Sequence, residues 1–143
     1  MIDSILLVDD ENLFHLVFED ACSLLDITLS LNSVSSTEEA EKIFAERFKN
    51  KDTSPECVFV DLNIIGSKYD GIEMIRKINY EYGNGVVVGI ISSSSDQAEQ
   101  TKAVQAGAQF WIVKSDDIEP RLEEFRKDFD GYKNKTAPFK VYK

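Results

Sequence analysis

The sequence lacks the features that would place a protein in or across a membrane. It contains no apolar run of about 18 residues, so no membrane-spanning helix is predicted. No basic stretch leads into an apolar core at the start of the chain, so a secretory signal peptide is not expected. These absences favour a cytoplasmic protein and predict no membrane partner.

Cysteine and histidine are also scarce. The two cysteines, Cys22 and Cys57, form no metal-binding or redox spacing and fall in segments predicted to be buried. We interpret them as reduced structural thiols, which suits the cytoplasm. The single histidine, His15, has no second histidine or cysteine near it in the sequence, so we do not expect it to bind a metal or to act in catalysis.

Positive charge is scarce relative to negative charge over most of the chain, where 12 Lys and Arg residues face 26 Asp and Glu residues in residues 1–130. The net charge is −10, and the last 13 residues hold four lysines and no acid, which leaves −14 on residues 1–130. A body this acidic repels nucleic acid, so no nucleic-acid partner is expected. Residues 1–130 are predicted to form one domain, and residues 131–143 a basic, solvated tail or the start of a linker.

What the sequence does contain is a regular alternation of strand and helix patterns. Four short apolar runs predict buried strands, at residues 5–8, 57–61, 86–91 and 110–113, and the alternation of apolar and polar residues over 27–31 predicts an edge-side strand. Five segments with helical spacing of apolar residues lie between and after them, at residues 12–25, 36–48, 71–82, 96–106 and 118–129. Such alternation predicts right-handed crossovers and an α/β fold, a doubly wound five-stranded parallel sheet.

Polar side chains follow four of the predicted strands at the point where each strand ends. Asp9 and Asp10 follow the first strand, and Asp61 ends the third, which is the central one. Ser92 follows the fourth strand and Lys114 the fifth. Because the carboxyl ends of parallel strands share one edge of a sheet, we expect these five side chains to lie together.

The chemistry of this group indicates phosphoryl transfer. Three carboxylates in one place need a cation, and a set of oxygen ligands without histidine or cysteine favours Mg²⁺ over zinc. The Ser92 hydroxyl and the Lys114 ammonium can receive the oxygens of a phosphoryl group. Asp61 would then be the carboxylate nucleophile.

Several short motifs carry a family resemblance over residues 3–130. They are Ile-Leu-Leu-Val-Asp-Asp-Glu at 5–11, Val-Phe-Val-Asp-Leu-Asn at 58–63, Asp70-Gly71, Ile91-Ser92, Ala-Gly-Ala at 106–108 and Ile-Val-Lys at 112–114. With them the chain resembles the receiver domain of bacterial two-component response regulators. The resemblance implies a flavodoxin-like (β/α)5 receiver fold.

The resemblance also implies roles for particular residues. Asp61 would accept a phosphoryl group from a sensor histidine kinase or a phosphotransfer protein. Asp9, Asp10, Asp61 and the backbone carbonyl of Asn63 would surround the Mg²⁺ ion. The protein would not be an enzyme for a separate substrate, because it would catalyse only its own phosphoryl transfer and dephosphorylation.

A second set of implied roles concerns signalling. Ser92 would move to the phosphoryl group and Lys114 would pair with it. Trp111, three residues before Lys114, falls where receivers carry an aromatic side chain that moves with that hydroxyl. Because Ser92 precedes helix 96–106 and Lys114 ends strand 110–113, we expect the signal to leave through these elements and helix 118–129.

Partners follow from the same resemblance. We expect a downstream effector protein or an output domain that is missing from this chain, and the sequence does not decide between a stand-alone receiver and the first part of a longer regulator. A homodimer is a further expectation, with Leu16 predicted on the solvent side of the first helix.

The chain departs from the family pattern at three places. Ile64-Ile65-Gly66 stand where receivers usually have a proline, three or four residues past the phosphorylated aspartate. The loop from Asp61 to Gly71 is about two residues long for the family, and Ser115 replaces the proline that normally follows the lysine. These changes affect loop geometry and hence phosphorylation lifetime, but they remove no chemical group.

Three alternatives to a phosphorylated receiver remain open or are disfavoured by particular residues. A pseudo-receiver would act as a binding module without phosphorylation. A phosphatase with an aspartate nucleophile needs a second aspartate two residues on, where this chain has Asn63. A flavodoxin-like cofactor module needs a glycine- and hydroxyl-rich phosphate loop after the first strand, where Asp9, Asp10 and Glu11 would repel phosphate.

Overall fold

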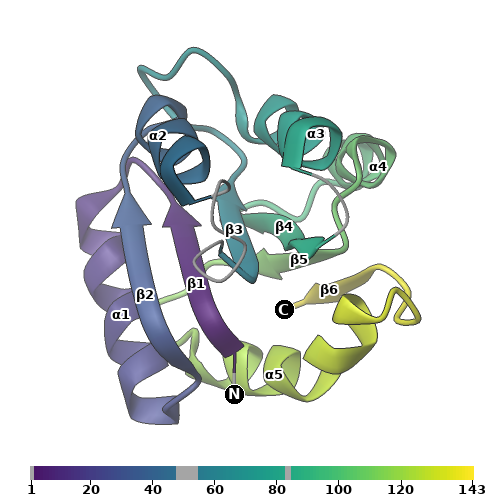
Figure 1. Cartoon of the computed structure of the whole chain (residues 1–143). Coiled ribbons are helices and arrows are strands. Elements are labelled where there is room, and N and C mark those ends of the chain that lie inside the picture. Colours follow the sequence, from purple (N-terminus) through teal and green to yellow (C-terminus); the bar gives the residue numbers. More distant parts are fainter. Residues whose placement is uncertain (1, 48–54, 83–84) are drawn as a thin grey trace.

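The structure is a computed structural model that describes residues 2–47, 55–82 and 85–143. Within these residues the strands form a single parallel sheet in the order β2-β1-β3-β4-β5-β6 (Figure 1). The strands are β1 (Ile2–Val8), β2 (Thr28–Val34), β3 (Cys57–Asp61), β4 (Val87–Ser92), β5 (Phe110–Val113) and β6 (Lys140–Tyr142).

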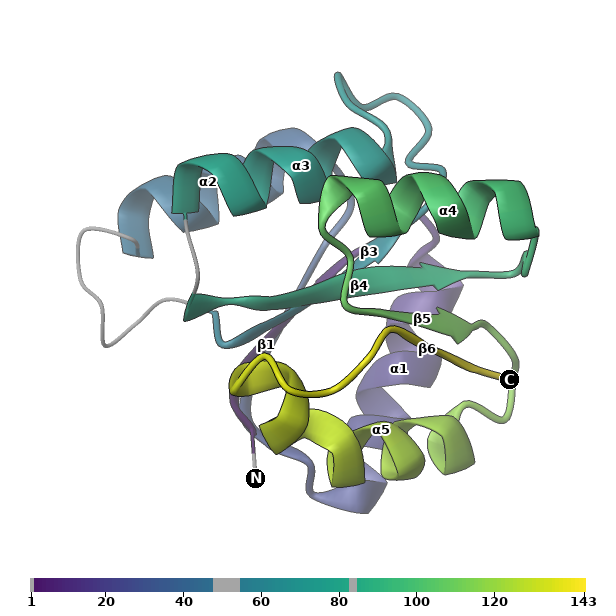
Figure 2. The ribbon, with the colours of Figure 1, turned by 90° about the vertical axis from the view of Figure 1, so that its right-hand side faces the viewer.

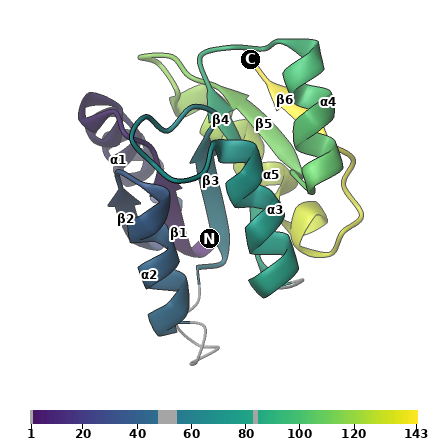
Figure 3. The same cartoon turned by 90° about the horizontal axis from the view of Figure 1, so that it is seen from above.

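Helices connect the strands and cover both faces of the sheet. They are α1 (Asn12–Leu25), α2 (Thr37–Arg47), α3 (Gly71–Tyr82), α4 (Gln97–Ala106) and α5 (Glu119–Lys133). Figures 2 and 3 show α2, α3 and α4 on one face and α1 and α5 on the other. The predicted α/β class, with a doubly wound parallel sheet, is confirmed.

Local sequence signals explain where several helices begin and end. The side chain of Asp96 accepts hydrogen bonds from the backbone N–H groups of Ala98 and Glu99 and so caps α4. Gly107 ends the same helix with a φ of 106°, a conformation that glycine adopts without a steric penalty. Pro120 lies in the first turn of α5, where its missing N–H costs no hydrogen bond.

The predicted bounds differ from the observed ones at a few places. β2 runs to Val34, three residues beyond the predicted end, and it is an edge strand as its alternating pattern indicated. The predicted end of the second helix at Phe48 and most of the loop after it lie outside the described residues.

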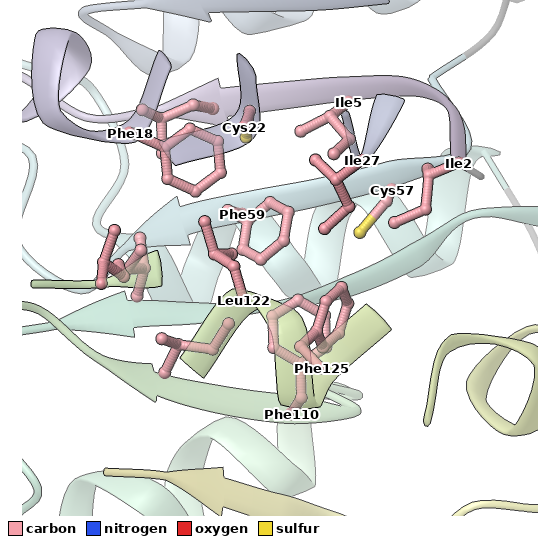
Figure 4. Close-up of a cluster of buried hydrophobic side chains, with 14 of the residues drawn as sticks. Ile2, Ile5, Phe18, Cys22, Ile27, Cys57, Phe59, Phe110, Leu122 and Phe125 are labelled. Carbon is pink, nitrogen blue, oxygen red and sulfur yellow. The ribbon is translucent and has the colours of Figure 1, made fainter. Parts of the chain in front are cut away.

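The core is organised around the central strand β3, in which every residue is buried. Phe59 lies on the α1 and α5 side of the sheet, and its ring meets those of Phe18, Phe110 and Phe125 with centroids 5.1–5.2 Å apart (Figure 4). Edge-to-face contacts of this kind add to the free energy of apolar burial. Val58 and Val60 lie in the core on the other face, which explains the unbroken apolar run.

The expectation of a solvated tail at residues 131–143 is wrong. Residues 131–133 belong to α5, and β6 adds a sixth strand in parallel register with β5, in which Ile112 is paired with Tyr142. The Tyr142 side chain is 1% exposed and lies in the same core cluster as Phe125. The lysines of this segment indicate solvation, but Phe139, Val141 and Tyr142 lie between them and supply apolar surface that can be buried.

None of the helices in the described part of the chain combines the length and apolar character needed to cross a membrane.

We predict that Phe59→Ala lowers the free energy of unfolding by about 3–5 kcal/mol, because it removes a fully buried ring and leaves a cavity. Urea unfolding followed by circular dichroism measures the loss. The control is Leu29→Ala on β2, whose side chain is 73% exposed and should cost about 0.5 kcal/mol or less. Equal losses in the two variants would contradict a core centred on Phe59.

Candidate functional site

The polar residues that were predicted to meet do lie at one edge of the sheet, where β1, β3, β4 and β5 end. Asp9 directly follows β1 and is 0% exposed, and Asp61 is the last residue of β3 and is 8% exposed. Both carboxylates therefore sit at the ends of buried strands rather than on a solvated loop.

Backbone hydrogen bonds hold the first two carboxylates in place. The Asp9 N–H donates to the carbonyl of Val34 over 3.0 Å, and the Asp9 Oδ1 atom accepts from the Glu11 N–H over 2.9 Å. The Asp10 Oδ2 atom accepts from the Ile65 N–H over 3.3 Å. The β1–α1 turn and the β3–α3 loop are thus joined through the acidic residues themselves.

Asp9, Asp10 and Asp61 form a group that could hold a metal ion. One oxygen from each carboxylate lies within 4.8 Å of the other two. A set of hard oxygen donors with negative charge suits Mg²⁺, as the sequence indicated. Asn63, whose carbonyl was expected to complete the set, lies two residues after Asp61 at the start of the β3–α3 loop and is exposed.

Lys114 supplies the positive charge at the centre of the acidic group. Its Nζ atom lies 2.6 Å from Asp9 Oδ2, 3.3 Å from Asp61 Oδ2 and 3.7 Å from Glu11 Oε2. The same atom stands 4.7 Å from the centre of the Phe14 ring, and the Lys114 N–H donates to the carbonyl of Ser92 over 2.8 Å. Burial lowers the pKa of Lys114, but its hydrogen bond to Asp9 and the two carboxylate charges raise it above its usual value.

The surroundings of Asp61 favour its protonated form when no cation other than Lys114 is present. Burial, and after it the charge of Asp9, raises the pKa of Asp61 to about 7, and Lys114 offsets only part of this effect. A second cation would favour the carboxylate, which is the form that can act as a nucleophile.

Gly71 allows the loop after Asp61 to close. A Cβ atom at this position would lie 2.2 Å from the carbonyl oxygen of Asp61, so a larger residue would displace the end of β3. The Gly71 N–H also donates to the carbonyl of Leu62 over 3.0 Å. This contact gives a physical reason for the Asp70-Gly71 motif, because α3 begins directly against the strand that carries Asp61.

Ser92 and Trp111 lie on the neighbouring strands β4 and β5 and are linked through one residue. The Ser92 side chain, at the end of β4, accepts a hydrogen bond from the Ser94 N–H over 3.2 Å. The indole N–H of Trp111 donates to the Ser94 carbonyl over 2.9 Å. Trp111 is 0% exposed and faces the side of the sheet opposite Phe110 and Ile112, because successive strand residues point to opposite faces.

Sequence reasoning missed the part that His15 plays near the site. The His15 side chain, one turn into α1, donates from Nε2 to the backbone carbonyl of Asp9 over 2.5 Å. It therefore supports the turn that presents Asp9 and Asp10. The sequence offered one signal, the position of His15 in the first turn of the helix that follows Asp9 and Asp10. A hydrogen bond to a backbone carbonyl involves no second side chain, so no residue pattern in the sequence reveals it.

With the geometry established, comparison with known proteins identifies the family. The model of the response regulator receiver domain matches residues 5–124. The chain therefore belongs to the response regulator receiver domain family. A search of curated proteins found no match.

Solved structures with the same fold are also response regulators. Response regulator RPA3017 of R. palustris is 24% identical, with a TM-score of 0.74 over 95% of this chain and 96% of that one. The phosphorylated cyanobacterial phytochrome response regulator RcpA is 20% identical, with a TM-score of 0.70 and coverage of 96% and 97%. NtrX of Brucella abortus is 23% identical, with a TM-score of 0.73 over 94% of this chain, which spans only 29% of NtrX.

The raised pKa of Asp61 predicts a pH dependence of stability without Mg²⁺. The folded state binds the Asp61 proton more tightly than the unfolded state, so this residue makes stability fall as the pH rises from about 4 to about 7. Asp61→Asn removes the effect. Its gain in Tm over the wild type should therefore be several degrees larger at pH 8 than at pH 5, since 1 kcal/mol corresponds to about 3–4 °C for a domain of this size.

Thermal unfolding in chelator-treated buffer at the two pH values tests this prediction. The matched control is Asp20→Asn on the exposed surface of α1, which removes the same charge outside the site. A gain for Asp61→Asn that does not change with pH would show that burial and Asp9 do not control this carboxyl.

Proposed function

We propose that this receiver domain is a phosphoacceptor, in which Asp61 takes a phosphoryl group from a sensor histidine kinase or a phosphotransfer protein in a Mg²⁺-dependent reaction. One observation supports the proposal above all others. Asp61 ends the central strand with the Lys114 ammonium 3.3 Å from its Oδ2 atom and the Asp9 and Asp10 carboxylates beside it. The same sheet edge thus holds a nucleophile, a cation and a cation-binding group.

Each residue has a defined part in the proposed reaction. The Asp61 carboxylate attacks phosphorus, the bond between phosphorus and the donor histidine nitrogen breaks, and the imidazole leaves. Asp9, Asp10, Asp61 and the Asn63 carbonyl would hold Mg²⁺, which supplies charge neutralisation for the phosphoryl oxygens when bound. The Lys114 ammonium lies close to both Asp9 and Asp61, so it would be able to pair with the phosphoryl oxygens while the group is transferred to Asp61.

The phosphorylated state of RcpA, a relative with the same fold, agrees with this proposal but does not test it. A partner kinase, and an effector or an output domain that receives the signal, are part of the proposal, as is the cytoplasmic location. The domain would act on no separate substrate and would catalyse only its own phosphorylation and dephosphorylation. Asn63, rather than a second acid, follows Asp61 by two residues, so the site offers no acid–base partner for a phosphatase reaction there.

Signalling would start at Ser92. On phosphorylation its hydroxyl would bond a phosphoryl oxygen, and Trp111, which is tied to the same loop through Ser94, would respond. The expected route through α4, β5 and α5 needs one correction, because the outer edge of β5 is not free. It is paired with β6 over the register from Phe110 to Ile112.

Chemical phosphorylation tests the role of Asp61. Incubation with Mg²⁺ and acetyl phosphate should add one phosphoryl group that is stable in acid and labile in base, as expected of an acyl phosphate. Intact-mass spectrometry measures the adduct, and Asp61→Asn should abolish it. Lys114→Ala should reduce it by at least about tenfold, because the phosphoryl oxygens lose their ammonium partner. Labelling of Asp61→Asn as strong as that of the wild type would contradict the assignment.

Mg²⁺ should stabilise the protein through the acidic group. Binding to the folded state alone adds about 2.7 kcal/mol at a concentration 100 times the Kd. Asp10→Asn should raise the Tm in the absence of metal, because it relieves repulsion, and it should lose most of the Mg²⁺ increment. Calorimetric scans with and without Mg²⁺ measure both effects, and an undiminished increment in Asp10→Asn would count against the site.

A further inference from the structure

The chain's own C-terminal strand occupies the outer edge of β5. The three residues of β6 pair with Phe110, Trp111 and Ile112 in parallel register, and Figure 2 shows β6 running alongside β5 at the end of the sheet. This position lies within the face through which the proposed signal would leave. A partner that needed the edge of β5 would therefore compete with β6.

Side chains hold β6 on both faces of the sheet. Toward α5, the Tyr142 hydroxyl donates to Asp128 Oδ2 over 2.7 Å and lies 2.8 Å from the Tyr132 hydroxyl. On the opposite face, Phe139 and Val141 pack against the core cluster that contains Trp111. A strand of three residues makes few ladder hydrogen bonds, so these side-chain contacts decide whether it stays docked.

Other contacts of β6 are weak. The Lys140 ammonium lies 2.8 Å from Glu124 and 3.2 Å from Asp128, but its side chain is 43% exposed. Solvent screens ion pairs at such positions, and they contribute little to docking. The docked state is therefore held by a small number of groups around Tyr142 and Trp111, and a moderate change in either can shift its population.

A continuous set of contacts joins β6 to the phosphorylation site. Ser92 accepts a hydrogen bond from the Ser94 N–H, and the Ser94 carbonyl accepts one from the Trp111 indole. Trp111 is in turn the register partner of Val141 in β6. Any movement of Ser92 that carries Ser94 with it must either break the indole bond or move the indole, and a close-packed interior transmits that movement to Val141.

We propose that β6 is a strap on the edge of β5 whose docking is coupled to the phosphorylation of Asp61 through Ser92, Ser94 and Trp111. The proposal rests on the proposed function of Asp61 as phosphoacceptor. In the resting state the strap covers the edge of β5. Phosphorylation weakens its docking and opens that edge, and by reciprocity the release of the strap strengthens phosphoryl binding by the same factor.

Hydrogen exchange on the full chain tests the first half of the coupling. Beryllofluoride with Mg²⁺ serves as the probe for the acyl phosphate, and calorimetry on the same samples establishes that it binds. Peptides that cover residues 136–143 and 110–113 should exchange faster in the bound state, within the range of about 5–150-fold that is typical of coupled sites. The same peptides in Asp61→Asn should show no response.

A pair of tyrosine variants tests the reciprocal half. Tyr142→Phe keeps the buried ring but removes the hydroxyl bonded to Asp128, so it should loosen β6 and tighten beryllofluoride binding by at least about fivefold. Tyr80→Phe removes the same atom from a side chain that is 90% exposed on α3, and it should leave the affinity unchanged. Circular dichroism verifies that both variants are folded.

The outcomes separate this proposal from the one on which it depends. If beryllofluoride does not bind the wild type, the proposed function is wrong and the strap proposal falls with it. If it binds but exchange at residues 136–143 is unchanged, the strap proposal alone is overturned. Should Tyr142→Phe fail to fold, the exchange measurement on the wild type still decides the question.

Discussion

The interaction on which the site depends is the contact of one buried ammonium with several carboxylates. Lys114 lies 2.6 Å from Asp9 and 3.3 Å from Asp61, and its side chain is only 9% exposed. Charges of one sign cannot share a buried edge without such a partner, because unpaired carboxylates in the interior are costly. Even with Lys114 present the negative charge of the site is only partly neutralised, since the pKa of Asp61 is still raised to about 7. The residual negative charge suits the binding of a second cation.

The rest of the fold holds these charges in position. β3 is buried along its whole length and delivers Asp61 to the sheet edge, while the Phe59 ring anchors that strand among three other aromatic rings. Gly71 brings α3 against the carbonyl of Asp61, where any side chain would collide. His15 supports the Asp9 carbonyl from α1. Core packing and site geometry are thus parts of one arrangement, in which the candidate site residues are held by buried strands and the elements packed on them.

The C-terminal strand alters the face that was proposed for signalling. In a five-stranded receiver the edge of β5 would be open, whereas here β6 covers it and Tyr142 enters the core. Trp111 then lies between the loop that carries Ser94 and strand β6, which carries Val141. A fully buried indole with contacts on two sides can move only if those contacts move or break. An aromatic ring at the surface is free to turn toward solvent.

The sequence by itself determined the alternation of strands and helices, the edge at which Asp9, Asp10, Asp61, Ser92 and Lys114 meet, and the motifs of the receiver family. These features are local, because apolar periodicity sets the elements and the end of each strand is visible in the residue that stops the run. It did not reveal β6 or the His15 contact. A three-residue strand has too little pattern to separate it from a basic tail, and its stability comes from Tyr132, Asp128 and the edge of β5. Only the tertiary structure brings those partners together, since the free energy that orders such a short segment lies in contacts with residues elsewhere in the chain.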